Sequence, residues 1–191
     1  MSKDYYAYLS RMKNIYRWGL MRNTRRESLS EHSFEVALVA HALGVINNVR
    51  LGGSVNPEHL ATVALFHDTS ETLTGDMPTP VKYYNPEIKA AYKMVETVAE
   101  EKLLSMLPDD FKACYKPLYD MDDQTKAFVK AADRISALIK CIEETAMGNR
   151  EFESAKASIE KSIRNLNLAE ADIFLDEFIE SYALTLDEQG I

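Results

Sequence analysis

The chain has 191 residues, with 22 lysines and arginines against 30 aspartates and glutamates, so its formal charge at pH 7 is −8. This acidic balance argues against a nucleic-acid polymer as a partner, because contact with a phosphate backbone requires a basic surface. A hydrophobic content of 46% is typical of a folded globular protein, and we expect one domain over residues 1–191.

The sequence shows no sign of a membrane span or a disulfide framework. The longest uncharged run, residues 36–49, is too short to cross a bilayer. Residues 1–26 alternate charged and aromatic side chains and lack the apolar core of a signal peptide. Cys114 and Cys141 alone do not suggest a disulfide-stabilised fold. We therefore expect a cytoplasmic protein that does not contact a membrane.

The first part of the chain predicts two helices joined by a basic segment. Residues 4–18 form an amphipathic pattern, and arginines cluster in residues 22–26. Ser28, with Glu31 three residues later, fits a capping box that starts the second helix. This helix is apolar on two opposite sides, which predicts a central, buried position. One side carries His32, Val36, Val39 and Leu43, and the other carries Phe34, Leu38, His41 and Val45.

Further helices follow along the chain. Asn56-Pro57 and Asn85-Pro86 each combine an N-cap residue with a proline at the first helical position. The first start predicts a helix into His67-Asp68, followed by a loop over residues 74–80 that two prolines stiffen. The second predicts a helix up to Pro108. No segment alternates like a strand, so the predicted fold class is all-α, a single helical bundle. The remaining helices are expected over residues 123–147, 152–166 and 168–184.

Metal-binding side chains occur at three places on the predicted central helices. His32, the adjacent pair His67 and Asp68, and Asp133 offer imidazole nitrogen and carboxylate oxygen, which divalent metals of intermediate hardness prefer. Asp133 borders the apolar face of its helix, where a carboxylate is costly unless it is paired or coordinated. If the third helix continues past Asp68, Glu71 points to the same side and places an acid or base beside the metal.

A His-Asp dipeptide alone is weak evidence, but the spacing of all four residues forms an H…HD…D pattern with further motifs around it. These motifs are Leu9 to Lys13, Arg17-Trp18, Ser30 to Ser33, Gly75-Asp76-Met77-Pro78-Thr79-Pro80 and Lys130 to Asp133. Together they resemble the bacterial HD-domain 5′-deoxynucleotidases, within the superfamily of HD-domain metal-dependent phosphohydrolases. The resemblance covers residues 9–144, and residues 184–188 fit the family's tail.

The resemblance implies an enzyme, a metal-dependent phosphomonoesterase, and a role for each matching residue. One divalent transition metal ion such as cobalt, manganese or copper would be held by His32, His67, Asp68 and Asp133, of which His32 and Asp133 would also contact substrate. Arg17 would orient the phosphate and Glu71 would transfer a proton as catalytic residues. The substrates would be deoxyribonucleoside 5′-monophosphates, and a homodimer is implied. The nucleoside would be held, and a 2′-hydroxyl disfavoured, by Trp18, Asp76, Met77, Pro78 and Thr79.

Elementary chemistry agrees with these roles. A phosphate monoester resists hydrolysis because its negative charge repels the nucleophile, and a bound metal both neutralises oxygens and supplies hydroxide near neutral pH. Arg17 adds a planar, bidentate clamp that keeps its charge. Trp18 facing a proline-stiffened loop can crowd out a hydroxyl, although rejection by sterics alone is modest. Asp76 could accept a hydrogen bond from the 3′-hydroxyl of the sugar.

Other interpretations stay open from the sequence. A different HD phosphohydrolase would act on a cyclic nucleotide, a nucleoside triphosphate or an alarmone, but longer phosphate chains require more positive charge than Arg17 and Lys82 supply. A non-catalytic binding module would use the four ligands only to join helices. Without the resemblance, Trp18 would be interpreted as a core anchor at the end of the first helix. We expect His41 to be a buried histidine with a hydrogen-bond partner.

Overall fold

The computed structural model describes residues 3–82 and 84–190; residues 1–2, 83 and 191 of the predicted domain lie outside these ranges. The predicted all-α class is confirmed: within the described ranges there is no strand, and an isolated antiparallel bridge joins Tyr16 to Ser28. No helix in the same ranges is long and apolar enough to cross a membrane. The α-helices are α1 Tyr5–Leu9, α2 Leu29–Arg50, α3 Pro57–Phe66, α4 Glu71–Thr74, α5 Thr79–Lys82, α6 Pro86–Ser105, α7 Asp109–Tyr119, α8 Asp123–Ala146, α9 Glu153–Arg164 and α10 Ala169–Glu177. The 3-10 helices are η1 Ser10–Asn14, η2 Arg150–Phe152 and η3 Ile179–Ala183.

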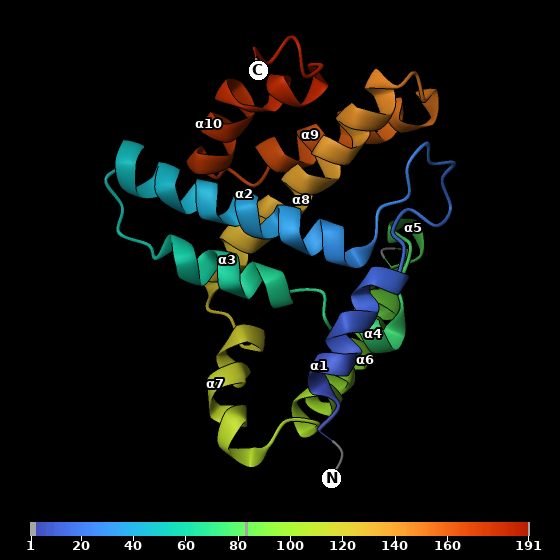
Figure 1. Ribbon diagram of the computed structural model, residues 1–191, viewed down its shortest axis with the longest axis vertical. Coiled ribbons are helices and arrows are strands. Elements are labelled where there is room, and N and C mark those ends of the chain that lie inside the picture. The colour runs from blue at the N-terminus through green and yellow to red at the C-terminus, as the bar shows by residue number, and fades with distance from the viewer. Residues whose placement is uncertain (1–2, 83, 191) are drawn as a thin grey trace.

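Helix α2 organises the fold. It crosses the middle of the molecule in Figure 1, and it packs against α3, α8 and α10. The predicted capping box is confirmed, because the Ser28 hydroxyl accepts from the Glu31 amide and the Glu31 carboxylate accepts from the Ser28 amide. Gly44 allows α3 to approach closely, since a Cβ at this position would lie 3.0 Å from Leu60 Cδ1. The start of α2 is thus fixed locally, and its middle is fixed by packing.

One face of α2 lies in the main hydrophobic core. Val36, Val39 and Leu43 are at most 2% exposed and pack with apolar residues of α3, α8 and α10. Burying each such side chain contributes about 1.5–3 kcal/mol to folding. His32 lies on the same face and is completely buried. The core therefore holds a histidine rigidly at the N-terminal end of the helix.

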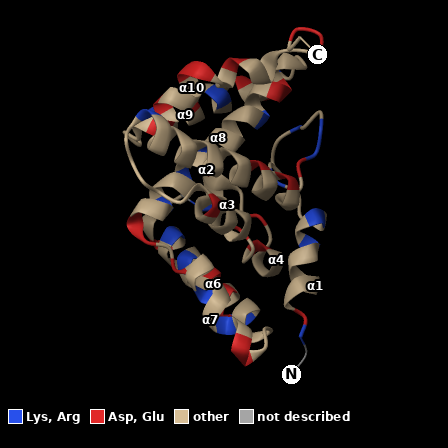
Figure 2. Cartoon of the chain, turned by 60° about the vertical axis from the view of Figure 1, so that its left-hand side comes forward, with Lys and Arg blue, Asp and Glu red and all other residues tan. Residues whose placement is uncertain are grey.

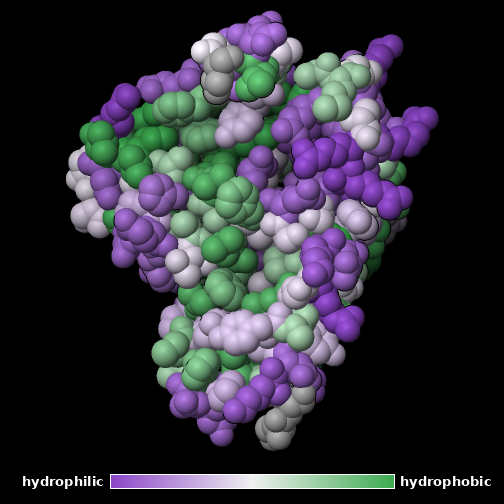
Figure 3. Space-filling model, in the orientation of Figure 1, coloured by the Kyte–Doolittle hydropathy of each residue, from purple (hydrophilic) through white to green (hydrophobic). Residues whose placement is uncertain are grey.

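The prediction that α2 is buried on both sides is wrong. Phe34, Leu38 and Val45 are 61%, 57% and 39% exposed, and His41, predicted to be buried, is exposed as well. The helices that pack on α2 all contact its other faces and leave this stripe, which we call the outer face of α2, uncovered within the described residues. Figure 3 shows apolar side chains gathered on the side of the molecule that carries α2 and α3.

The predicted first helix, residues 4–18, consists of two shorter pieces, α1 and η1. Beyond η1 the chain becomes extended and pairs with the segment that enters α2. The Arg17 amide donates to the Glu27 carbonyl (3.0 Å), and the Leu29 amide donates to the Ile15 carbonyl (2.8 Å). We call this segment the 15–29 loop. Its main-chain N–H and C=O groups form hydrogen bonds across the loop, and the spacing of apolar residues in the sequence does not predict such pairing.

The third helix also ends earlier than predicted. Helix α3 stops at Phe66, and the chain continues in tight turns, in which the Glu71 amide donates to the Asp68 carbonyl (3.0 Å). These turns lead into the short helix α4, which Gly75 ends with a φ of +74°, a conformation that favours glycine. Residues 79–80, predicted as part of the loop, begin α5 instead.

The remaining helices form two groups around α2 and α3 in Figure 1, with α6 and α7 on one side and α9 and α10 on the other. The helix predicted from Asn85-Pro86 is confirmed as α6, but α7 was not predicted. Val95 and Val98 of α6 are 49% and 64% exposed. Figure 2 shows that charged residues are frequent on α6, α7, α9 and α10 and scarce on α2. The long helix α8 is confirmed, whereas the last predicted helix stops at Glu177 and continues as a 3-10 turn.

Candidate active site

The four predicted metal-binding residues come together from three elements. His32 lies near the start of α2, His67 and Asp68 directly follow α3, and Asp133 lies on α8. His32 Nε2 is 3.2 Å from Asp133 Oδ1 and 3.6 Å from Asp68 Oδ2, and His67 Nε2 is 3.1 Å from the same Asp68 oxygen. Donor atoms bound to one ion at about 2.0–2.2 Å lie roughly 3.0–3.6 Å apart. The spacing of the His32, His67 and Asp68 atoms therefore fits a single metal ion, and Asp133 lies beside His32 at the edge of this group.

The two imidazole rings present their Nε2 atoms to this cluster. Both Nε2 atoms are buried and have no hydrogen-bond partner. The Nδ1 atoms are occupied: that of His67 lies 2.7 Å from the Ala64 carbonyl, and that of His32 lies 3.1 Å from Ser136 Oγ. A ring whose Nδ1 donates a hydrogen bond offers the Nε2 lone pair, which is the form that binds a metal. His32, His67 and Asp68 form the group of donors that lie within 4.8 Å of one another.

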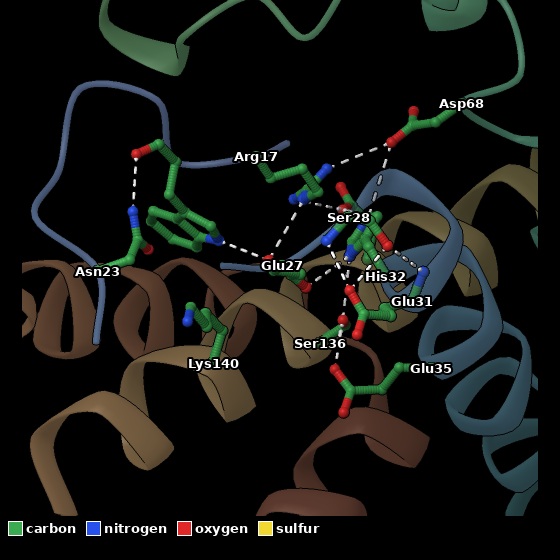
Figure 4. A network of polar contacts seen from close by, with 12 residues as sticks. Arg17, Asn23, Glu27, Ser28, Glu31, His32, Glu35, Asp68, Ser136 and Lys140 are labelled. Carbon is green, nitrogen blue, oxygen red and sulfur yellow. Dashed lines mark hydrogen bonds and ion pairs between the residues drawn. The ribbon is translucent and has the colours of Figure 1, made fainter. Parts of the chain in front are cut away.

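Arg17 lies directly against the carboxylates of this cluster. Its NH1 atom is 3.3 Å from Asp68 Oδ2 and its NH2 atom is 3.9 Å from Asp133 Oδ1, as Figure 4 shows in part. Burial alone would lower the pKa of Arg17, but the two aspartates raise it above its ordinary value. The guanidinium therefore supplies a permanent positive charge beside Asp133, whose side chain is 39% exposed.

The acidic groups of the site divide into ionised and protonated ones. Burial opposes ionisation of Asp68 and Asp133, but the neighbouring histidines and Arg17 hold their pKa values below the usual range. Glu71 is 6% exposed, and burial together with the charges of Asp68 and Asp76 raises its pKa to about 9. The site thus keeps two carboxylates charged and a third one able to carry a proton at neutral pH.

Trp18 stands beside Arg17 in the 15–29 loop, not at the end of a helix. Its backbone is left-handed, with a φ of +61°, which costs a residue with a side chain about 1–2 kcal/mol. The indole Nε1 donates to Glu27 Oε2 (2.7 Å), and the ring packs against Phe152 with centroids 5.4 Å apart. The Trp18 carbonyl accepts from Asn23 Nδ2 (3.2 Å). These contacts compensate for the strained backbone and fix the residue.

The predicted substrate loop lies close to the same cluster at its first residue. Burial raises the pKa of Asp76, and the charges of Arg17 and Asp68 act on its carboxyl group. Met77 and Pro78 are half-buried and follow directly, while Thr79 is exposed at the start of α5. The contacts of these three residues with a substrate stay a prediction.

Comparison with known proteins assigns the chain to a protein family. Residues 4–182 match the model of the family described as 5′-deoxynucleotidase YfbR-like. The chain belongs to this family. It is 50% identical to a 5′-deoxynucleotidase of Photobacterium profundum and 49% identical to one of Erwinia tasmaniensis, over 96% of the chain and 96% and 94% of those proteins. An HD-domain phosphohydrolase of Listeria innocua has the same fold, with a TM-score of 0.82 at 26% identity over 97% of this chain and 91% of that one. The predicted family is confirmed.

Three residues around the site were not predicted from the sequence. Ser136 Oγ donates to Glu35 Oε2 (2.6 Å) while it contacts His32, so these two side chains orient the buried ring. Helical spacing could have indicated two of them, because Glu35 lies three residues after His32 and Ser136 lies three residues after Asp133, on the same side of each helix. Glu27 had no such signal, since it precedes the capping box in an irregular segment.

Proposed function

We propose that this protein is a metal-dependent 5′-deoxynucleotidase, which hydrolyses deoxyribonucleoside 5′-monophosphates to a deoxyribonucleoside and orthophosphate. The observation that carries the proposal is the position of Arg17, whose guanidinium lies within 3.9 Å of both aspartates, beside two histidine nitrogens that have no hydrogen-bond partner. An anion-binding group is thus held next to a metal-binding one, as a phosphate monoester requires. The family and its relatives named 5′-deoxynucleotidases support the substrate class.

A single divalent transition metal ion is the cofactor that we propose, with cobalt, manganese or copper as candidates. His32, His67, Asp68 and Asp133 would hold it, because two imidazoles with carboxylates suit such ions. The donor atoms of His32, His67 and Asp68 lie within 4.8 Å of one another, and Asp133 Oδ1 is 3.2 Å from His32 Nε2. When bound, the ion would neutralise phosphate oxygens and lower the pKa of a coordinated water. The buried Ser136 and the half-buried Glu35 would keep the His32 ring in its binding orientation.

The side chains around this position would bind the phosphate and move a proton. Arg17 would hold two phosphate oxygens at once, and its charge does not titrate near neutral pH. Glu71, with its raised pKa, would carry a proton that it donates to the 5′-oxygen of the leaving nucleoside. A carboxyl that stays protonated at neutral pH is suited to act as a general acid.

The sugar would lie between Trp18 and the segment from Asp76 to Thr79. Asp76 would accept a hydrogen bond from the 3′-hydroxyl, and the indole ring would crowd the position of a 2′-hydroxyl. The fixed position of Trp18 supports this role, because steric exclusion requires a wall that does not yield. Discrimination of this kind is modest, on the order of a hundredfold at best.

A panel of nucleoside monophosphates tests the function. Purified protein, freed of metal and then supplied with cobalt, manganese, copper or magnesium, should release orthophosphate from deoxyribonucleoside 5′-monophosphates and little from 3′-monophosphates or ribonucleotides. Release of pyrophosphate or tripolyphosphate from longer substrates would instead indicate a different HD phosphohydrolase. If no deoxynucleotide yields phosphate with any of these metals, the proposal is wrong.

We further propose that the protein forms a homodimer, as its resemblance to the family implies, through the outer face of α2. Phe34, Leu38, His41 and Val45 recur at alternating spacings of four and three residues, which is the pattern of a helix seam that can pair with its own copy. Leu38→Glu should shift the mass measured by light scattering from dimer to monomer, while Leu51→Glu, also exposed but outside the stripe, should not. A monomeric wild-type protein would contradict this proposal.

A further inference from the structure

Glu27 takes no part in the proposed chemistry, yet its carboxylate touches three residues of the site. Its Oε2 atom accepts the indole N–H of Trp18 at 2.7 Å and lies 3.7 Å from Arg17 Nε, and its Oε1 atom lies 3.7 Å from His32 Nδ1. The side chain is 11% exposed. Figure 4 shows Glu27 between Arg17 and His32, in the interior of the 15–29 loop. A carboxylate in this position is held by charge on one side and holds an aromatic ring on the other.

The ring of Trp18 depends on this contact for its orientation. Asn23 and Met21 bind only the main-chain carbonyl of Trp18, so they fix the backbone and leave the side-chain torsions free. Phe152 packs against one side of the ring at an angle of 56°, a contact that permits sliding. Among the contacts of the described residues, the hydrogen bond to Glu27 is the directional contact of the indole.

Glu27 itself cannot swing away easily. Its main-chain carbonyl accepts the Arg17 amide at 3.0 Å, and its carboxylate faces the Arg17 guanidinium. The next residue, Ser28, caps α2. A hydrogen bond to an ionised acceptor is shorter and stronger than a neutral one, and partial burial strengthens it further. The indole is therefore tied to the start of the central helix through one carboxylate.

We propose that Glu27 is a specificity-determining positioning residue, which holds the Trp18 indole in place so that the ring excludes a 2′-hydroxyl. The inference rests on the proposed 5′-deoxynucleotidase function. Exclusion by crowding fails if the wall can move by the size of a hydroxyl group, and a ring held only by its contact with Phe152 can move. Glu27 acts through Trp18 and makes no contact with substrate in this account.

The test compares Glu27→Ala and Glu27→Gln with the wild-type enzyme. The first readout is the ratio of kcat/KM for a deoxyribonucleoside and a ribonucleoside 5′-monophosphate of the same base. The second is the fluorescence of Trp18, which is the only tryptophan in the chain. A general loss of structure would lower turnover of both substrates alike and leave the ratio unchanged.

We expect Glu27→Ala to lower the ratio about tenfold, which corresponds to the loss of a charge-assisted hydrogen bond of about 1.4 kcal/mol. The Trp18 emission should move to longer wavelength, and acrylamide should quench it more strongly. In Glu27→Gln the amide oxygen can still accept the indole N–H, so ratio and emission should stay close to those of the wild type. Glu170→Ala is the control, because Glu170 is a buried carboxylate that binds Asn47 (2.6 Å) at the other end of α2. It should change neither readout.

Either of two results for Glu27→Ala overturns the proposal. One is a ratio equal to that of the wild type, and the other is an unchanged Trp18 emission. If this variant does not fold, Trp18→Phe removes the donor of the same hydrogen bond, and an undiminished ratio in that variant overturns the proposal as well. The fluorescence needs no activity. A wild-type protein that hydrolyses no deoxynucleotide would therefore refute the proposed function, while the emission of Glu27→Ala would still decide whether Glu27 holds the ring.

Discussion

Replacing Glu71 with glutamine should raise the folding stability of the metal-free protein. The same substitution should abolish most of the activity that the protein has with added metal. The Glu71 side chain is buried, its Oε2 atom has no hydrogen-bond partner, and its pKa is raised from 4.5 to about 9. At pH 7 the folded protein therefore holds a neutral carboxyl group, while the unfolded chain holds a carboxylate. Glutamine has nearly the same shape and is neutral in both states, so it avoids the cost of taking up a proton on folding.

The size of the effect follows from the two pKa values. Between the unfolded pKa of 4.5 and pH 7, each unit corresponds to about 1.4 kcal/mol, which sets an upper limit of roughly 3 kcal/mol for the gain in folding free energy. A buried amide also needs partners, so we expect a gain on the order of 1–3 kcal/mol. Turnover should fall by about 10²–10⁴-fold, because the amide cannot transfer a proton.

The pH dependence has a defined sign. From about pH 4.5 to about pH 9 the folded wild-type protein binds one more proton at Glu71 than the unfolded chain, so this group makes stability fall as the pH rises. The advantage of Glu71→Gln should grow through the same window and level off on both sides. Urea unfolding of metal-free wild type and variant at several pH values measures it, and phosphate release with added metal measures turnover.

Glu170→Gln is the matched control, since Glu170 is equally buried but lies outside the site. It should leave turnover unchanged. A Glu71→Gln variant that is less stable than wild type at every pH would refute the argument from the raised pKa. A variant with full turnover would refute proton transfer by Glu71. If, in addition, metal removal only lowered the melting temperature, the alternative in which the metal only joins helices would be favoured.

Other predictions concern the residues around this group. Glu144→Ala should cost about 3–5 kcal/mol in urea unfolding, because it removes the carboxylate that neutralises the buried Lys140 and leaves the Arg25 carbonyl as an acceptor for its ammonium. Burial opposes ionisation of Glu144, but hydrogen bonds from Lys140 and Asn149 lower its pKa from 4.5 to about 2, so this stability is present above about pH 4.5 and the difference from wild type should vanish as the pH falls through about 2. Arg17→Lys should lower kcat/KM by roughly 10–100-fold at unchanged metal affinity measured by calorimetry, because a lysine cannot bind two oxygens in a fixed plane. Removal of the metal by a chelator should abolish turnover and leave the helical circular dichroism signal, whereas unfolding on chelation would indicate a structural metal.

Helix starts could be predicted from the sequence because capping is a local interaction. The Asn56 side chain accepts from the His59 amide (2.9 Å) and the Asn85 side chain accepts from the Ile88 amide (2.7 Å), as the Asn-Pro pairs indicate. Helix burial could not be predicted in the same way. The apolar pattern of α2 shows which sides avoid charge, but only the packing of other helices decides that Leu43 is buried and Leu38 is exposed.

The proposed metal ligands and the residues around them differ in how far the sequence predicts them. His32 and Asp133 are 101 residues apart, and it was the family pattern, not their local sequence, that predicted their meeting. Ser136 and Glu35 then follow from helical spacing, since each lies three residues beyond a ligand on a helix that faces the other. Residues on regular helices thus become predictable once one contact between the helices is known.

Contacts in the 15–29 loop cannot be predicted from helical spacing in this way. The cause also affects how the specificity of the site can change. Trp18 is placed by its side-chain hydrogen bond to Glu27, and Arg17 by a main-chain hydrogen bond and an ion pair to the same residue. The Thr24 amide and hydroxyl attach the loop to Glu144 of α8. None of these contacts follows a helical period. The proposed metal ligands, by contrast, are fixed by packing of α2, α3 and α8. Substitutions within the loop can therefore move the wall beside the sugar without moving the metal ligands, so selectivity between sugars should vary more readily than phosphate hydrolysis itself.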